Sequence, residues 1–290
     1  KGFHPLLYLK NKQSGRKTIP FELRLNSENH ILILSGPNAG GKSVAMKSVG
    51  LLQMMVQSGL LIPVHELSEF GIFKQIFADI GDQQSLDDDL STYSSRLQNA
   101  RVFIQKATPD TLILIDEMGS GTDPKPGGAI AEAILRQLHR KGVYAVVTTH
   151  YSNLKVYAFR NPGILNGNMH FDKDTLSPTY ELKVGRPGSS YAFEIAEKSG
   201  LSRDLIGYAR NRTGSETAVD DILIELQREK QELEEKLSAV KENEQKLERL
   251  IKTYDGLHQE LDVKRKRLKL DQKEHELRLS ANTNREVDKL

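Results

Sequence analysis

The chain has 290 residues, a formal net charge of +2 at pH 7, 28% charged residues and no cysteine or tryptophan. This length suffices for an α/β domain of about 150–200 residues plus an accessory region. The lack of cysteine excludes a disulfide scaffold, a thiolate metal site and a thiol nucleophile, and no apolar run reaches the roughly 18 residues of a membrane helix. We expect a soluble, cytoplasmic protein that does not enter membranes. The missing initiator methionine suggests a piece excised from a longer protein.

The first half of the sequence alternates short apolar runs with helical patterns. The run Ile31–Leu34 is followed by glycines and then by a helical stretch, Ser43–Gln57, which indicates strand, loop and helix. Two more apolar runs, 111–115 and 144–149, are separated by helical spacing over 129–141. Continuously apolar strands are typical of a mainly parallel sheet covered by helices on both faces, so the predicted class is α/β.

The sequence beyond this core divides into three parts. Residues 161–185 indicate turns and short strands at the end of the sheet, and two short helices are expected at Ser190–Ser199 and Asp204–Arg212. Thr213, Gly214 and Ser215 then suggest a hinge or cap before the charged tail.

The tail shows a seven-residue repeat of apolar or aromatic residues, typical of a coiled-coil helix. Its members are Val219, Leu226, Leu233, Val240, Leu247, Tyr254, Leu261 and Leu268. The second seam is poor, because Glu229, Lys236 and Asn243 interrupt it, so a single solvated helix with weak pairing is an alternative. Asp255 and Gly256 could turn the chain back as a hairpin, but the unbroken repeat favours one helix of roughly 100 Å at 1.5 Å per residue.

A phosphate-binding loop lies between the first strand and its helix. Residues 36–43 match G-x-x-x-x-G-K-[ST] in full, so backbone N–H groups and the helix N-terminus are expected to bind the phosphates of ATP. Lys42 would reach the β- and γ-phosphates, and the Ser43 hydroxyl would ligate Mg²⁺. The nucleotide-binding residues predicted in this segment are Gly36, Pro37, Asn38, Ala39, Gly40, Gly41, Lys42, Ser43 and Val44.

Polar residues at two other strand ends complete the predicted site. Asp116 follows the second strand and would hold the hydrated magnesium, while Glu117 would accept a proton from the attacking water. His150 follows the third strand and would lie near the γ-phosphate. Each has a purely structural alternative, a solvated strand cap for the acids and an ordinary strand-end histidine for His150.

These motifs, in this order, resemble the ATPase domain of the MutS family, specifically its second bacterial branch, the type II MutS proteins. The resemblance runs from His4 to about Arg212 and is carried by Ser35–Ser43, Asp79–Gln84, Ser91–Tyr93, Leu114–Thr122, Thr148–Tyr151 and Gly188–Tyr191. Thr122–Pro124 and alanine at position 39 are similar to the second branch. Gln83 and Gln84 depart from the acids usual in mismatch-repair members, which leaves the water network undefined.

The resemblance implies an ABC-type P-loop NTPase that works as a homodimer, in which Ser91 and Thr92 of one subunit complete the nucleotide site of the other. It also implies adenine contacts from His4, or from Ile19 and Phe21. The implied domains are the ATPase over 1–186, a helical dimerisation subdomain over 187–214 and the coiled coil over 215–290. Members usually carry core and clamp domains before this region and an Smr-type nuclease after it, and neither occurs in this sequence.

The family resemblance implies an ATP-driven clamp on nucleic acid, acting on branched DNA in recombination suppression or on rRNA in stalled ribosomes. We expect nucleic acid to bind mainly outside this region, with only weak, salt-sensitive binding at the basic run Lys264–Lys269. One alternative is an ABC-type head of a chromosome-organising coiled-coil protein, although the Leu-Ser-Gly-Gly motif of that class is absent. Another is a nucleotide-gated binding module with little turnover, which Glu117 argues against.

Overall fold

The computed structural model describes residues 1–37, 40–81, 89–172, 177–188, 191–213 and 215–287, with side chains left out at 89–92 and in parts of the C-terminal helix. Two compact units are formed, Lys1–Glu229 and Lys230–Leu290. The first holds a six-stranded sheet in the order β2-β3-β4-β1-β5-β6. The second is formed by the continuation of one helix, α8.

The sheet is parallel except at one edge. Its strands are β1 (Ile31–Ser35), β2 (Gln75–Asp79), β3 (Thr111–Ile115), β4 (Tyr144–Thr148), β5 (Ile164–Asp172) and β6 (Ser177–Val184). Only β5 and β6 pair antiparallel. Because β1 lies between β4 and β5, the loop after β1 opens at the middle of the sheet. The strands predicted at 31–34, 111–115 and 144–149 are confirmed, and so are the short strands expected within 161–185.

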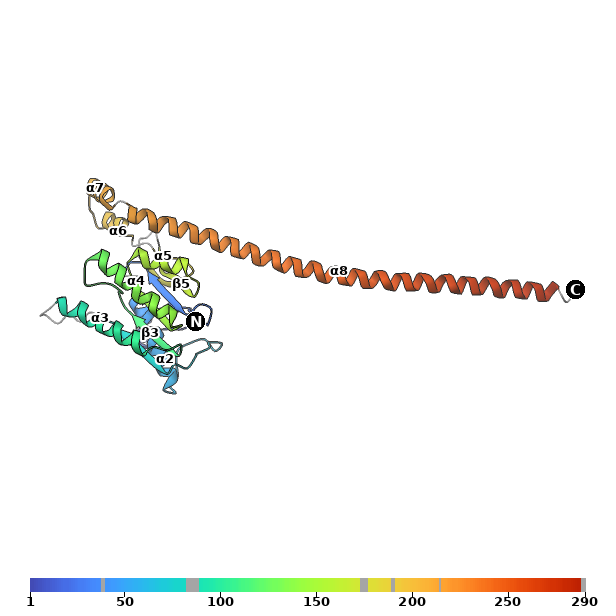
Figure 1. Cartoon of the computed structure of the whole chain (residues 1–290), viewed down its shortest axis with the longest axis horizontal. Coiled ribbons are helices and arrows are strands. Elements are labelled where there is room, and N and C mark those ends of the chain that lie inside the picture. The colour runs from blue at the N-terminus through green and yellow to red at the C-terminus, as the bar shows by residue number, and fades with distance from the viewer. Residues whose placement is uncertain (38–39, 82–88, 173–176, 189–190, 214, 288–290) are drawn as a thin grey trace. The chain divides into compact units, whose positions relative to one another are not determined.

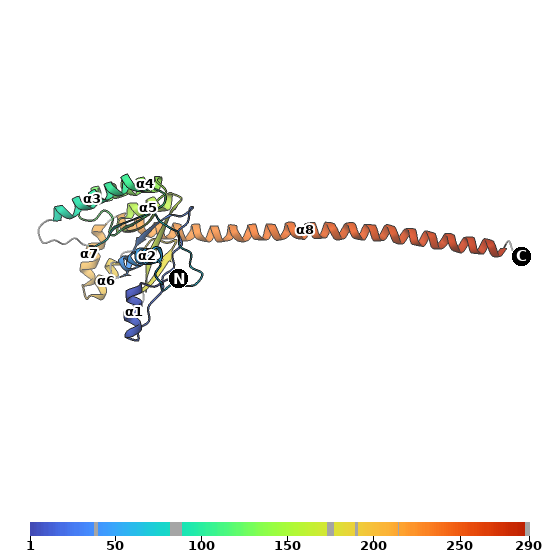
Figure 2. The same ribbon diagram turned by 90° about the horizontal axis from the view of Figure 1, so that it is seen from below.

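Alternate side chains of the central strands point to opposite faces, as the strand period of two requires. On one face Ile31 and Ile33 pack with residues of α3, α4 and α5, and on the other Leu32 and Leu34 pack with Met46 of α2. Figures 1 and 2 show α3 and α4 together on one side of the sheet. The helices are α1 (Pro5–Gln13), α2 (Lys42–Gln57), α3 (Asp89–Lys106), α4 (Pro124–Arg140), α5 (Ser152–Arg160), α6 (Ala192–Lys198), α7 (Arg203–Thr213) and α8 (Ser215–Val287).

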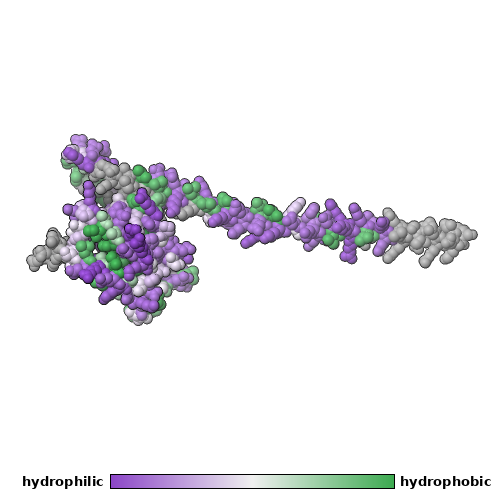
Figure 3. Space-filling model, in the orientation of Figure 1, coloured by the Kyte–Doolittle hydropathy of each residue, from purple (hydrophilic) through white to green (hydrophobic). Residues whose placement is uncertain are grey.

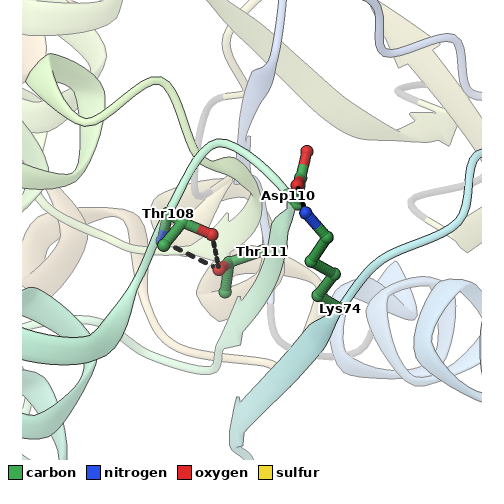
Figure 4. A network of polar contacts seen from close by, with 4 residues as sticks. All are labelled: Lys74, Thr108, Asp110 and Thr111. Atoms are coloured by element: carbon green, nitrogen blue, oxygen red, sulfur yellow. Dashed lines mark hydrogen bonds and ion pairs between the residues drawn. The ribbon is translucent and has the colours of Figure 1, made fainter.

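A small polar network fixes the turn that leads into β3. The Thr108 backbone N–H donates to Thr111 Oγ1 at 2.9 Å, and the two threonine hydroxyls lie 3.3 Å apart (Figure 4). Lys74 Nζ pairs with Asp110 at 2.6 Å in the same view. This pair links the start of β2 to the start of β3, and its exposure means that it adds little stability of its own.

The charged tail forms one continuous helix, as the repeat predicted. α8 has 73 residues and contains Gly256 without a break. The side chains of the repeat that are described, Leu226 to Leu268, are between 43% and 67% exposed. Figure 3 shows such apolar residues as separate patches among charged ones along the helix. Among the helices in the described residues, none has an apolar stretch long enough to cross a bilayer.

Candidate ATP-binding and hydrolysis site

The loop after β1 has the backbone of a phosphate cradle. Gly36 and Gly41 have φ of 121° and 90°, a region that side chains disfavour. A Cβ on Gly40 would lie 3.2 Å from the Cβ of Met169, and one on Gly41 would lie 3.3 Å from the Tyr180 ring. Positive φ favours glycine at Gly36 and Gly41, and a side chain at Gly40 would have to displace Met169. The loop ends directly at the N-terminus of α2. Asn38 and Ala39 lie outside the described residues. Pro37 lies in the loop just before them, and Val44 lies in the first turn of α2.

Lys42 lies inside this cradle rather than on its surface. The side chain is only 3% exposed, and Nζ donates a hydrogen bond to the Gly36 carbonyl at 2.6 Å. Burial lowers the pKa of Lys42 to about 8, with Glu117 and Asp116 opposing the shift and Lys155 adding to it. A cation that is poorly solvated in the free site gains more from an incoming phosphate than a solvated one would.

Asp116 joins the loop to the neighbouring strands through two hydroxyl groups. Its carboxylate accepts from Ser43 Oγ at 3.1 Å and from Thr148 Oγ1 at 2.5 Å. A carboxylate and a hydroxyl are hard oxygen ligands of the kind Mg²⁺ takes when it keeps most of its waters. The pair predicted as metal ligands is thus brought together and fits magnesium. The described residues contain no larger cluster of His, Asp or Glu suited to a metal.

Glu117 follows at the end of β3 in an unusual backbone conformation. Its φ is 50°, which is rare for a residue with a side chain. Its N–H donates to Thr148 Oγ1 at 2.8 Å, and its carbonyl accepts from Arg96 Nη1 at 3.1 Å. The side chain is half-buried beside Asp116, where a carboxylate can serve as a base toward a bound water.

His150 follows β4, two residues after Thr148, and is exposed at the site. The pKa of His150 is lowered mainly because neighbouring groups shield the ring from water. The positive charges of Lys42 and Lys155 lower the pKa further. The imidazole is therefore neutral at pH 7, able to donate or accept one hydrogen bond near the terminal phosphate.

The remaining predicted site residues either have no described contact with the phosphate loop or lie outside the described residues. Ser91 and Thr92 belong to the first turns of α3, but their side chains lie outside the described residues, as do Gln83 and Gln84. His4 caps α1 through Nδ1, Ile19 is 38% exposed, and Phe21 pairs with Gly2 through two backbone bonds of 2.9 Å. The adenine assignments therefore stay predictions.

Sequence reasoning missed three residues that shape the site: Arg96, Thr148 as a bridge, and Lys155. Lys155 is 3% exposed and donates to the Gly188 carbonyl at 3.2 Å, while the Gly188 N–H donates to Ser35 Oγ at 2.7 Å. A lysine at helical spacing in α5 gives no signal of burial. Only Thr148, two residues before the histidine at the end of β4, could have suggested a second contact to Asp116.

A phosphate loop after β1, with acids and a histidine at the ends of the adjacent strands β3 and β4, defines a P-loop ATPase fold. The family model for MutS domain V matches residues 32–215. The chain therefore belongs to the MutS domain V family.

Relatives of this chain include three bacterial proteins named Endonuclease MutS2. That of Halothermothrix orenii is 42% identical over 275 residues, which is 92% of this chain and 33% of the relative. That of Pelotomaculum thermopropionicum is 42% identical over 266 residues, with 91% and 33% covered. That of Lactiplantibacillus plantarum is 37% identical over 284 residues, with 97% and 34% covered. The chain thus spans about a third of the length of these relatives.

Proposed function

We propose that this chain binds ATP and hydrolyses it to ADP and phosphate, as the motor domain of a dimeric, type II MutS clamp that acts on nucleic acid in the cytoplasm. The observation that carries the proposal is the meeting of Lys42, Ser43 and Asp116 at the mouth of the glycine cradle, with Glu117 beside them. The resemblance to proteins named MutS2 favours this function over that of a chromosome-organising head.

The residues present account for each step of hydrolysis. The loop N–H groups and Lys42 hold the β- and γ-phosphates in place. Asp116 and Ser43 would hold Mg²⁺, which supplies charge neutralisation on the phosphate oxygens. Water attacks the γ-phosphorus as its bond to the β–γ bridging oxygen breaks, and Glu117 accepts the proton released by the water. Neutral His150 donates a hydrogen bond to the transferring phosphoryl group.

We also propose that the site is completed by a second subunit, through Ser91 and Thr92. Two surfaces support pairing. The apolar repeat on α8 is about half exposed, and apolar side chains of α7 such as Leu205, at 60%, are exposed as well. Exposed apolar area stabilises an assembly by about 25 cal/mol per Å² when it is covered. The target, recombining DNA or ribosomal RNA, would be engaged mainly by regions beyond the aligned third of the relatives.

Two substitutions test the assigned roles. Lys42→Ala should weaken ATP binding by about 10- to 100-fold, because a charge-assisted contact to phosphate is lost. Lys106→Ala, at an exposed lysine on α3, is the control and should leave binding unchanged.

Glu117→Gln should keep ATP binding and slow turnover by about 10²–10⁴-fold, because the base is lost. Equilibrium binding and phosphate release measure the two effects separately. Normal turnover in Glu117→Gln would refute the proposed base.

A further inference from the structure

Arg96 of α3 reaches across to the turn that carries the proposed base. Its Nη1 lies 3.3 Å from the Asp116 carbonyl, 3.1 Å from the Glu117 carbonyl and 2.5 Å from Ser120 Oγ. The arginine is half-buried and makes further contacts beyond these. Nη1 carries two N–H donors on a charged group, so its hydrogens can be shared among neighbouring acceptors of the turn, and hydrogen bonds from a charged donor are stronger than those from a neutral one.

The turn that Arg96 holds is strained. Glu117 has φ of 50°, and a residue with a side chain stays in this region only when its surroundings enforce it. Thr148 Oγ1 accepts the Glu117 N–H at 2.8 Å, and Arg96 binds the carbonyls on both sides of the residue. The two peptide groups that set the direction of the Glu117 side chain are therefore fixed from opposite sides, by β4 and by α3.

We propose that Arg96 is a positioning residue for hydrolysis: it holds the Asp116–Ser120 turn so that the Glu117 carboxylate faces the attacking water. The proposal rests on the proposed function, since it assigns a role through Glu117. Arg96 neither binds nucleotide nor takes a proton in this role. Its loss should lower kcat and leave ATP affinity unchanged.

The docking of α3 does not depend on Arg96 alone. One turn along, Asn99 Nδ2 donates to Asp79 Oδ1 at 3.0 Å, and Phe103 is buried in the core under the same helix. The ring of Phe103 stacks on Phe77 of β2 with centroids 5.1 Å apart. A variant that lacks only the guanidinium group should therefore stay folded, with the Glu117 turn released.

The test compares Arg96→Ala with Arg101→Ala, an exposed arginine of the same helix, in the full chain. We expect Arg96→Ala to lower kcat about 10- to 100-fold, the range for losing orientation rather than the base itself. The dissociation constant for a non-hydrolysable ATP analogue should stay within about threefold of the parent value, because Arg96 does not contact the nucleotide in this role and effects at independent sites are small. Arg96→Lys should recover part of the rate, and Arg101→Ala should match the parent.

Adding Arg96→Ala to Glu117→Gln distinguishes positioning from other roles. If Arg96 acts through Glu117, the double variant should hydrolyse ATP within about threefold of Glu117→Gln alone, because residues that act as a unit are not additive. Full additivity, or weaker analogue binding in Arg96→Ala, would overturn the proposal. A parent-like kcat in Arg96→Ala together with slow Glu117→Gln would refute the Arg96 role alone. Fast Glu117→Gln would refute the assigned base, and with it the role of Arg96, whereas a parent chain that neither binds nor hydrolyses ATP would refute the proposed function.

Discussion

At the scale of single residues, two strained backbone positions lie at the nucleotide site. Three residues with side chains have positive φ among the described residues: Glu117, Tyr180 and Tyr191. Glu117 carries the proposed base, Tyr180 lies against Gly41 of the loop, and Tyr191 stacks on Phe171 of β5 with centroids 5.2 Å apart. Such conformations persist when the surrounding packing fixes them, which suits a site that must be rigid before substrate arrives.

His30 gives the fold a measurable dependence on pH at the opposite end of β1. Its ring stacks on His139 with centroids 5.4 Å apart, and its Nε2 is buried without a hydrogen-bond partner among the described residues. The pKa of His30 is lowered from 6.5, first by burial and then by His139. The unfolded chain therefore binds more protons than the folded one just below pH 6.5, and stability falls as pH drops through this range.

We expect the midpoint of thermal unfolding to decrease from pH 7 to pH 5, and to decrease less in His30→Gln, which cannot be protonated. His170→Gln, at an exposed histidine of β5, should retain the parent dependence. Scanning calorimetry at several pH values gives the comparison. Identical slopes for the parent and His30→Gln would show that His30 is not the titrating group.

The sequence predicted the site residues that belong to a motif, but it did not predict those whose place in the site depends on tertiary packing. Lys42 and Ser43 belong to the loop motif, whose spacing indicates a strand, a loop and a helix. Asp116 follows a separate apolar strand, and its carboxylate accepts a hydrogen bond from Ser43, as predicted from its place at the strand end. Arg96 left no pattern, since its partners are mostly carbonyl groups that every residue has. The burial of Lys155 likewise follows from tertiary packing, which a helical charge pattern does not reveal.

At the scale of elements, residues 185–188, which follow β6, pack against the phosphate loop. A Cβ on Gly188 would lie 2.9 Å from Gly36 Cα, from the Ser35 carbonyl and from the Asn168 Cβ. Asn168 Nδ2 also donates to the Arg186 and Pro187 carbonyls at 3.2 and 3.3 Å. Residues 186–188 therefore form part of the wall behind the loop.

Gly188→Ala should lower the free energy of unfolding by about 1–3 kcal/mol, the usual cost of overpacking, and should weaken ATP binding because Gly36 must move. Gly207→Ala in α7 is the matched control, since its Cβ meets nothing within 4 Å. That substitution should be neutral or stabilising by up to about 1 kcal/mol. Urea denaturation and analogue binding measure both effects, and equal outcomes for the two variants would contradict this packing argument.

The two fully buried strands were predicted from their sequence, whereas β2 and α5 were not. β1 and β3 are buried at every position, which matches their unbroken apolar runs. β2 has exposed residues at two of its five positions, so Gln75–Asp79 resembles a loop in sequence. The nine-residue α5 is short, and its pattern is weak beside the histidine and tyrosine that precede it.

At the scale of the whole molecule, the proposed shared site can be tested by mixing two defective chains. A Lys42→Ala chain keeps Ser91 and Thr92, while a Ser91→Arg, Thr92→Ala chain keeps its loop. Together they should restore about one working site per mixed dimer, because the intact halves meet across the interface. Phosphate release after mixing, with sedimentation in ATP, gives the measurement. Normal hydrolysis by the isolated Ser91→Arg, Thr92→Ala chain, or full turnover by monomers, would contradict the shared site.

The contacts of α8 include a path of hydrogen bonds that leads toward the phosphate loop. Gln227 Oε1 on α8 accepts from Asn166 Nδ2 at 3.4 Å, and the same amide donates to the Lys155 carbonyl at 3.0 Å. Lys155 in turn holds Gly188, which touches the loop at Gly36. This path of contacts joins the base of α8, through Asn166 of β5 and Lys155, to the segment that packs against the phosphate loop. By reciprocity, any force that changes ATP affinity through this path implies that ATP binding does work against that force.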